Sequence, residues 1–326
     1  LEYHSNGNIN EAARYYNYFL KRGFEDPIVF SNFGVICIQL GKYELAINLY
    51  QRSISTFPDN LEAYSNLGNL YKELGQTDQA EKLLRKALII NPNFSDANSN
   101  LGTLLLDRGD LEEAEYFINK AIQLNPNSFE DHSNLGLILR KKDKYKEAEI
   151  STLKAIKINP YFIPAYNNLC SIFLSLDKIN EAEKSVNRAI EIDPNIAISY
   201  HNLGIIQRRK NDYKKAKLSI LKSIEINPNS ASAFNDLGVV LLKLKKRNEA
   251  ENYIRRALNI DPSFAMALSN LCEILANKGK IIEAEECARK AIILNNKLVS
   301  AYINLALILY KKNDFNNSEK YLAIAI

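Results

Sequence analysis

The chain has 326 residues and a formal net charge of +4, with 46% hydrophobic and 25% charged residues. These fractions are ordinary for a soluble protein, and no apolar run approaches the roughly 20 residues that a membrane-spanning helix requires, so we expect no membrane insertion. A net charge this small also argues against nucleic acid as the partner.

The most regular feature of the sequence is an Asn-Leu-Gly tripeptide that returns every 34 residues. Its clearest copies begin at Asn66, Asn100, Asn134 and Asn202. A fixed period between about 20 and 50 residues is typical of a repeat array. We therefore expect one array of small units in place of the two or three globular domains that the length alone suggests.

The repeats can be followed from one end of the chain to the other. Residues 1–26 are predicted to be a partial repeat, mainly its second helix, because Glu11-Ala12 falls in register. Eight full repeats of 34 residues occupy residues 27–298, and residues 299–326 form a ninth that stops inside its second helix. Because a solenoid needs polar end repeats, we expect a fragment of a longer protein; the alternative is end-to-end self-association through the uncapped ends.

Each repeat is predicted to be a pair of helices, as residues 61–94 show. Apolar residues three and four apart over residues 61–74 indicate a first helix, and Gly75 then starts a turn. A second apolar stripe over residues 79–90 indicates a second helix. Pro92 ends it, because proline lacks the amide donor and disfavours helical geometry in the preceding residue.

The pattern resembles the tetratricopeptide repeat family over essentially the whole chain. It shares the bulky-x-x-Leu-Gly-x-x-bulky run, the Glu-Ala pair after the turn, as in Glu113-Ala114, and the closing proline. Local departures are Cys170, Cys272 and Ala306 in place of the glycine, and Asn296 in place of the last proline. The resemblance implies an all-α, right-handed superhelical solenoid of helix-turn-helix repeats, whose first helices line a concave groove where partner proteins bind.

The residue types that carry catalysis or bind metals form no recognisable pattern. None of the four cysteines and three histidines has metal-site spacing. His132 stands in a bulky slot that favours a core position, and His201 is expected to be exposed and alone. No nucleophile–base pair or glycine-rich phosphate loop can be assigned. We therefore predict no catalysis, no cofactor and no metal, and the scattered cysteines favour a reducing cytoplasm.

A row of amides is the first candidate for partner binding. The sixth residue of each first helix forms this row: Asn32, Asn66, Asn100, Asn134, Asn168, Asn202, Asp236, Asn270 and Asn304. An amide both donates and accepts hydrogen bonds, so the row could hold the backbone of an extended protein or peptide. It is similar to the asparagine ladder in the superhelical tetratricopeptide domain of O-linked N-acetylglucosamine transferase. The alternative is a structural role, with each amide bonded to a neighbouring repeat.

A basic rim is the second candidate. The first helices end in cationic runs that contain Arg140, Lys141, Arg208, Arg209 and Lys243. Such residues would attract an acidic partner; the alternative is that they cap helix C-termini, where cations are favoured by the helix dipole.

These observations predict a protein–protein interaction scaffold that binds an extended, acidic partner segment along the groove. The alternative function is a substrate-recruiting arm of a larger enzyme, such as a glycosyl- or sulfotransferase, whose catalytic domain lies outside this chain. Nucleic acid is the least favoured partner, because no row of exposed aromatic residues is available to stack bases.

Overall fold

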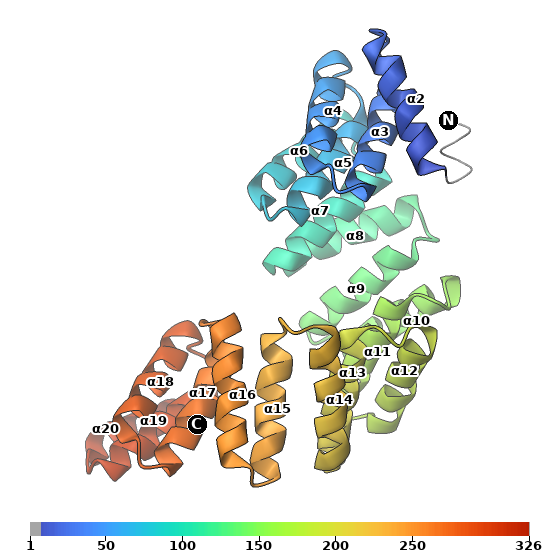
Figure 1. Cartoon of the computed structure of the whole chain (residues 1–326). Helices are drawn as coiled ribbons and strands as arrows, with labels where there is room; N and C mark the ends of the chain where they lie inside the picture. Colours follow the sequence, from blue (N-terminus) through green and yellow to red (C-terminus); the bar gives the residue numbers. More distant parts are fainter. Residues whose placement is uncertain (1–7, 326) are drawn as a thin grey trace. The chain divides into compact units, whose positions relative to one another are not determined.

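The computed structural model describes residues 8–325 (Figure 1). It divides into two compact units, unit 1 (Leu1–Asn168) and unit 2 (Leu169–Ile326). The boundary lies inside α11 (Ile163–Ser175). Residues 1–7 of the predicted partial repeat, and Ile326, lie outside the described residues.

Unit 1 opens with α2 (Ile9–Lys21) and continues with pairs of helices. The first helices of its pairs are α3 (Pro27–Gln39), α5 (Leu61–Glu73), α7 (Ser95–Arg108) and α9 (Phe129–Lys141). The second helices are α4 (Tyr43–Thr56), α6 (Thr77–Ile90), α8 (Leu111–Leu124) and α10 (Tyr145–Ile158). Each first helix packs on its own second helix, and α4, α6 and α8 pack in turn on the first helix of the next pair.

Unit 2 is built in the same way after α11 and α12 (Ile179–Ile192). Its further first helices are α13 (Ala197–Arg209), α15 (Ala231–Lys243), α17 (Ala265–Asn277) and α19 (Val299–Lys311). Their second helices are α14 (Tyr213–Ile226), α16 (Arg247–Ile260), α18 (Ile281–Leu294) and α20 (Phe315–Ala325). Helices α13 to α16 stand side by side in chain order (Figure 1). The predicted all-α solenoid of helix-turn-helix pairs is confirmed, and all regular secondary structure within residues 8–325 is helical.

Small residues set how closely the two helices of a pair approach. A Cβ atom added to Gly68 would lie 2.8 Å from Cγ of Leu84 on the paired helix. Ala80 and Ala87, on the same face of α6, have no exposed surface. Because a larger side chain would overpack this contact, the glycine and alanine slots of the repeat fix the crossing of the two helices.

The turns between paired helices need a left-handed backbone residue. Glycine supplies it at several turns, for example Gly75 with φ of +76°. Asp143 and Asn211 replace glycine in two others, since short polar side chains tolerate this conformation. Lys245, with φ of +61°, is neither a glycine nor a residue with a short polar side chain.

The predicted core position of His132 agrees with the structure. His132 is buried, and its Nε2 lies 3.1 Å from the Pro126 carbonyl oxygen. Burial lowers the pKa of this imidazole. Burial likewise raises the pKa of Cys170 and Cys272 to about 12, so both thiols stay protonated and unreactive at neutral pH.

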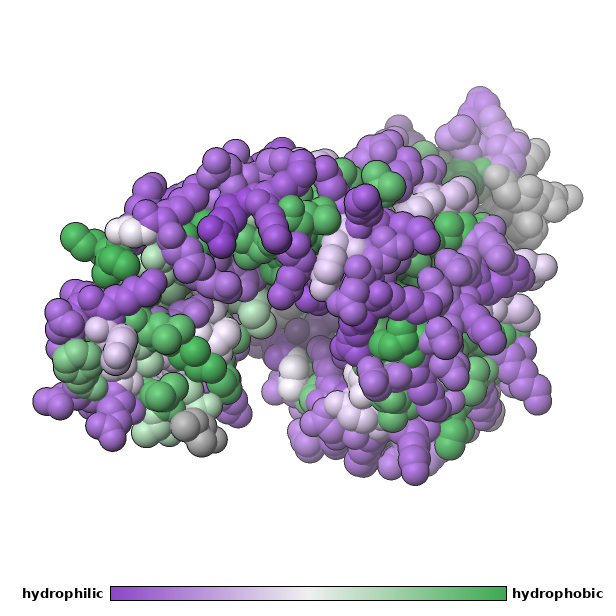
Figure 2. Space-filling model, turned by 90° about the horizontal axis from the view of Figure 1, so that it is seen from below, coloured by the Kyte–Doolittle hydropathy of each residue, from purple (hydrophilic) through white to green (hydrophobic). Residues whose placement is uncertain are grey.

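The surface shows no single extended apolar face in the view of Figure 2, where hydrophilic residues predominate and apolar residues form separate patches. Among the described residues, no helix has both the length and the apolar character to cross a membrane.

Candidate partner-binding face

The amide row links successive repeats. We call the side of the first helices that carries this row the first-helix face. In unit 1, Nδ2 of Asn100 donates to Oγ of Ser65 at 3.0 Å, and Nδ2 of Asn168 donates to Oγ of Ser133 at 3.0 Å. Nδ2 of Asn134 donates to the Thr103 hydroxyl at 3.3 Å. Each acceptor lies on the preceding first helix.

The same links occur in unit 2. Nδ2 of Asn270 donates to Oδ1 of Asn235 at 2.8 Å, and Nδ2 of Asn304 donates to Oγ of Ser269 at 3.1 Å. Asp236 lies 2.9 Å from Nε2 of His201, which is buried. The expectation of an exposed, solitary His201 was therefore wrong, because the next repeat covers this slot.

These contacts change what the row offers to a partner. In the five asparagines with these links, the amide N–H group donates to the protein itself, and Asn202 is also buried. Partner contact through the row stays a prediction. In the linked asparagines, only the carboxamide oxygen and the second amide N–H group can make such a contact.

The first junction of the row is different. Neither Asn32 nor Asn66 makes a side-chain hydrogen bond within residues 8–325, although both are only partly buried. The hydroxyl of Ser31, the acceptor expected for Asn66, lies 3.4 Å from Nδ2 of Asn60. The Asn60 amide also donates to Ser53 at 2.8 Å, and its Oδ1 accepts from the N–H of Ala63 at the start of α5.

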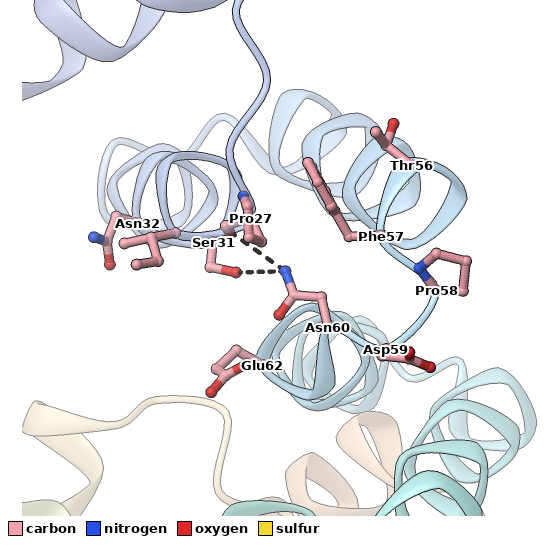
Figure 3. A pocket seen from close by; sticks show the side chains of 10 residues that line it. Pro27, Ser31, Asn32, Thr56, Phe57, Pro58, Asp59, Asn60 and Glu62 are labelled. Carbon is pink, nitrogen blue, oxygen red and sulfur yellow. Dashed lines mark hydrogen bonds between the residues drawn. The ribbon is translucent and has the colours of Figure 1, made fainter.

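A cavity of about 730 Å³ opens at this junction, between α3, α5 and the turn over residues 56–60. Figure 3 shows Pro27 and Ser31 of α3 facing the Asn60 amide, with Asn32 and Glu62 pointing to one side. Phe57 and the exposed Ile28 add apolar lining, and Asp59 and Glu62 add two carboxylates.

The two carboxylates at the cavity are unpaired. No ion pair involves Asp59 or Glu62 in the part of the chain that the structure describes. Further along the same ends of the first helices lie Asp96 and the buried Asp131, whose carboxylate accepts from the Ser99 hydroxyl at 2.5 Å. Lost hydration raises the pKa of Asp96, and the charges of Glu62 and Asp131 raise it further.

Two of the five residues of the predicted basic rim, Lys141 and Arg209, make intramolecular contacts. Nζ of Lys141 lies 3.4 Å from the Leu106 carbonyl oxygen, and a guanidinium nitrogen of Arg209 donates to the Leu174 carbonyl at 2.7 Å. These carbonyls end the preceding first helix, so the cations cap it, as the alternative interpretation of the rim predicted.

The other three rim residues are arranged differently. The Nε atoms of Arg140 and Arg208 are buried and have no hydrogen-bond partner among residues 8–325. Lys243 is exposed and lines a cavity of about 290 Å³ between α15 and α17. Arg247 joins it there, together with Val239, Leu242 and Glu273. A smaller cavity of about 100 Å³ follows between α17 and α19.

Sequence analysis missed a second set of links, between second helices and the following turns. Nζ of Lys142 lies 2.7 Å from Glu115, and Nζ of Lys278 lies 2.6 Å from Glu251. The sequence pattern of these links is a glutamate directly after the alanine that follows the turn, as in Ala114-Glu115, and a cation 27 residues later. The hydrogen bond from Lys278, together with one from Arg255, lowers the pKa of the Glu251 carboxyl.

The paired helices, the inter-repeat amide links and the cavities between first helices define a helical-repeat protein of the interaction class. Four models of the tetratricopeptide repeat match its sequence. They cover residues 2–61, 38–93, 73–137, 132–162, 163–196, 186–217, 231–264 and 299–326. Because these matches cover most of the chain, it belongs to the tetratricopeptide repeat family, whose fold is typically a non-catalytic interaction domain.

Solved structures agree with this assignment. The crystal structure of yeast Tom70 is similar with a TM-score of 0.56 at 16% identity, over 99% of this chain and 89% of that one. Pseudomonas aeruginosa PilF is similar with a TM-score of 0.55 at 21% identity, over 67% of this chain and 97% of that one. At these identities the likeness shows the fold alone. No curated protein matches the sequence.

Proposed function

We propose that this chain is a scaffold that binds an extended segment of a partner protein along the first-helix face. The observation that carries the proposal is the set of cavities between successive first helices, at α3/α5 in unit 1 and at α15/α17 and α17/α19 in unit 2. Each combines apolar lining with polar groups, the mixture that holds and orients a ligand.

The amide row supports an extended occupant. Its members recur at the pitch of the repeat, and the linked asparagines keep a carboxamide oxygen that can accept a main-chain N–H group. Asn32 and Asn66 have their whole amide available. An extended segment exposes alternating main-chain donors and acceptors, so such a row can hold it with little dependence on its sequence.

In unit 2 we expect acidic residues in the bound segment. Lys243 and Arg247 make no ion pair among the described residues, and both line the α15/α17 cavity, where Glu273 is the only acidic residue. Replacing both cations by glutamine should weaken the binding of an acidic peptide. The effect should shrink at high salt, because exposed charges are screened.

The proposal is tested by blocking the cavities in the full chain. We expect Asn32→Trp or Val239→Trp to reduce the amount of a partner segment that is captured and protected from protease. Ile150→Trp, at an exposed site on α10, is the matched control and should leave capture unchanged. Equal capture and protection in all three variants would contradict binding on the first-helix face.

A further inference from the structure

The α3/α5 cavity has a lining whose charge is of one sign. Its ten residues include two carboxylates, Asp59 and Glu62, and no lysine, arginine or histidine. On the second helices, several carboxylates are paired with cations, for example Glu81 of α6 with Arg85 and Arg108. Unpaired like charges around a cavity favour a cation inside it.

The helix dipole alone does not explain these acids. An acidic residue in the first turn of a helix is stabilised by the positive end of the dipole, and that would apply to every first helix. In the first turn, α5 has Glu62, α7 has Asp96, and α9 has Glu130 and Asp131. By contrast, α13, α15, α17 and α19 have no acidic residue there.

One acid also occupies a slot where the fold favours a small apolar residue. Asp131 is only 2% exposed, and the equivalent residues of α5 and α7 are Ala63 and Ala97, both fully buried. A buried carboxylate is costly without a cation beside it, and a serine hydroxyl is its partner. The acids therefore continue from the cavity along the starts of α5, α7 and α9.

We propose that the α3/α5 cavity binds a lysine or arginine side chain of an extended protein segment, and that Asp96 receives a second basic side chain of the same segment. This inference rests on the proposed function and specifies the partner for unit 1. The apolar side chains of Ile28 and Phe57 contact the aliphatic stem of the first basic residue. The carboxylate of Glu62, on the side of Asn32, faces its charge, and that of Asp59, on the other side of Asn60, adds to the negative potential (Figure 3). The free amide of Asn32 holds the adjacent main chain.

The spacing of the basic residues follows from the packing. Helices α5 and α7 are in contact, and packed helix axes lie roughly 8–10 Å apart. A segment in the polyproline II conformation advances about 3.1 Å per residue and points every third side chain to the same side, so equivalent points on the two helices are about three residues apart. The segment therefore carries its basic residues at positions i and i+3.

The test uses labelled peptides of about ten residues built from serine, alanine and leucine, with lysine at every third position. A second peptide has glutamate in place of lysine, and a third has its lysines adjacent. Binding to the full chain is followed by fluorescence anisotropy. We expect the peptide with spaced lysines to bind at least about tenfold more tightly than either of the others.

A charge-matched pair of variants locates the site. The triple variant Asp59→Asn, Glu62→Gln and Asp96→Asn should weaken binding of the spaced peptide by about tenfold or more. The control variant Glu44→Gln, Asp110→Asn and Glu147→Gln removes three exposed carboxylates from the starts of the second helices in unit 1. It changes the net charge equally and should alter binding by less than about twofold.

Several results would overturn the inference. An equal loss in both variants would show attraction by net charge only, and tighter binding of the glutamate peptide would show the wrong sign. If the lysine peptide fails while the glutamate peptide binds in a manner sensitive to Lys243→Gln and Arg247→Gln, the inference fails and the scaffold function stands. Melting curves of both variants check that the fold is intact.

Discussion

The first-helix faces of the two units share their cations and differ in their acids. Basic residues occur in the last turn of first helices in both units, such as Lys141 in unit 1 and Arg209 in unit 2. Acidic residues in the first turn occur on α5, α7 and α9 of unit 1, whereas α13, α15, α17 and α19 of unit 2 have none.

This difference separates what the repeat needs from what it leaves free. Lys141 and Arg209 cap the preceding first helix through bonds to carbonyls of its last turn, so the fold itself accounts for these two cations. Unit 2 forms the same pairs without acids at the helix starts, so the fold does not require the acids of unit 1. Their repeated presence there is better explained by a ligand than by folding.

The largest expected effect comes from reversing the charges that distinguish unit 1. Glu62→Lys with Asp96→Lys should weaken binding of the spaced lysine peptide by about a hundredfold, since each attraction becomes a repulsion. Anisotropy measures the affinity, and the glutamate peptide should gain. Replacement of Glu44 and Glu147 by lysine is the control. If it changed the affinity for the spaced lysine peptide by more than about threefold, the acids of the first helices in unit 1 would not be the cause.

The second largest effect is expected on stability, from removing the inter-repeat hydrogen bonds of the amide row, which both units have. In Asn100→Ala, Asn134→Ala and Asn168→Ala, three inter-repeat bonds are lost, two of them to buried hydroxyl groups. We expect the free energy of unfolding to fall by about 1 kcal/mol per site, measured by urea denaturation.

Asn32 and Asn66 provide the matched control within the same row. Neither makes a side-chain hydrogen bond in the described part of the chain, and alanine is the better helix former by roughly 0.5 kcal/mol. Alanine at these two sites should leave stability unchanged or slightly raised. Similar losses in both sets of variants would refute the structural role of the links.

The sequence predicted the fold well because each structural requirement recurs at one period. The glycine at Gly68 and the alanine at Ala80 mark close helix contacts in every repeat or nearly so, and a single sequence contains this pattern many times over. The roles of the asparagines could not be predicted, because the sixth residue of a first helix lies at the border between the open face and the preceding repeat. Its spacing is the same for either role.

The candidate cavity was missed for a different reason. It depends on Asn60, at a slot where other repeats have either a large apolar residue, such as Phe94 or Phe162, or a serine, as at Ser128 and Ser230. Its polar side chain is only 9% exposed and bonds to Ser31 and Ser53. Comparison of equivalent slots would have flagged it, as it would have flagged Asp131 among the alanines.

A smaller effect is expected at the turns. The turn between α5 and α6 in unit 1 has Gly75 in the left-handed position, whereas the turn between α15 and α16 in unit 2 has Lys245 with φ of +61°. Lys245→Gly should raise the free energy of unfolding by about 1 kcal/mol, because a residue with a Cβ atom is strained there. Lys246→Gly, at the neighbouring residue with φ of −95°, should give no such gain in thermal melts.

The smallest effect is the loss of stability that the charge of Asp96 causes in the folded chain. The pKa of Asp96 is raised in the fold, so its charged form is disfavoured at neutral pH. Asp96→Asn should therefore raise the free energy of unfolding by a few tenths of a kcal/mol at pH 7, because solvent screens an exposed charge. The gain should fall as the pH drops through the raised folded-state pKa of Asp96 and vanish below its unfolded-state pKa, where Asp96 is neutral in both states. A gain that persists at pH 3 would show another cause.

The most direct test of a partner segment on the first-helix face is to map where such a segment lies. A spaced lysine peptide with a photoreactive phenylalanine derivative at its centre can be cross-linked to the full chain, and the linked residues identified by mass spectrometry. We predict cross-links to α3 and α5, close to Ile28, Asn32 and Glu62. Cross-links concentrated on the second helices α4 and α6 would contradict the account.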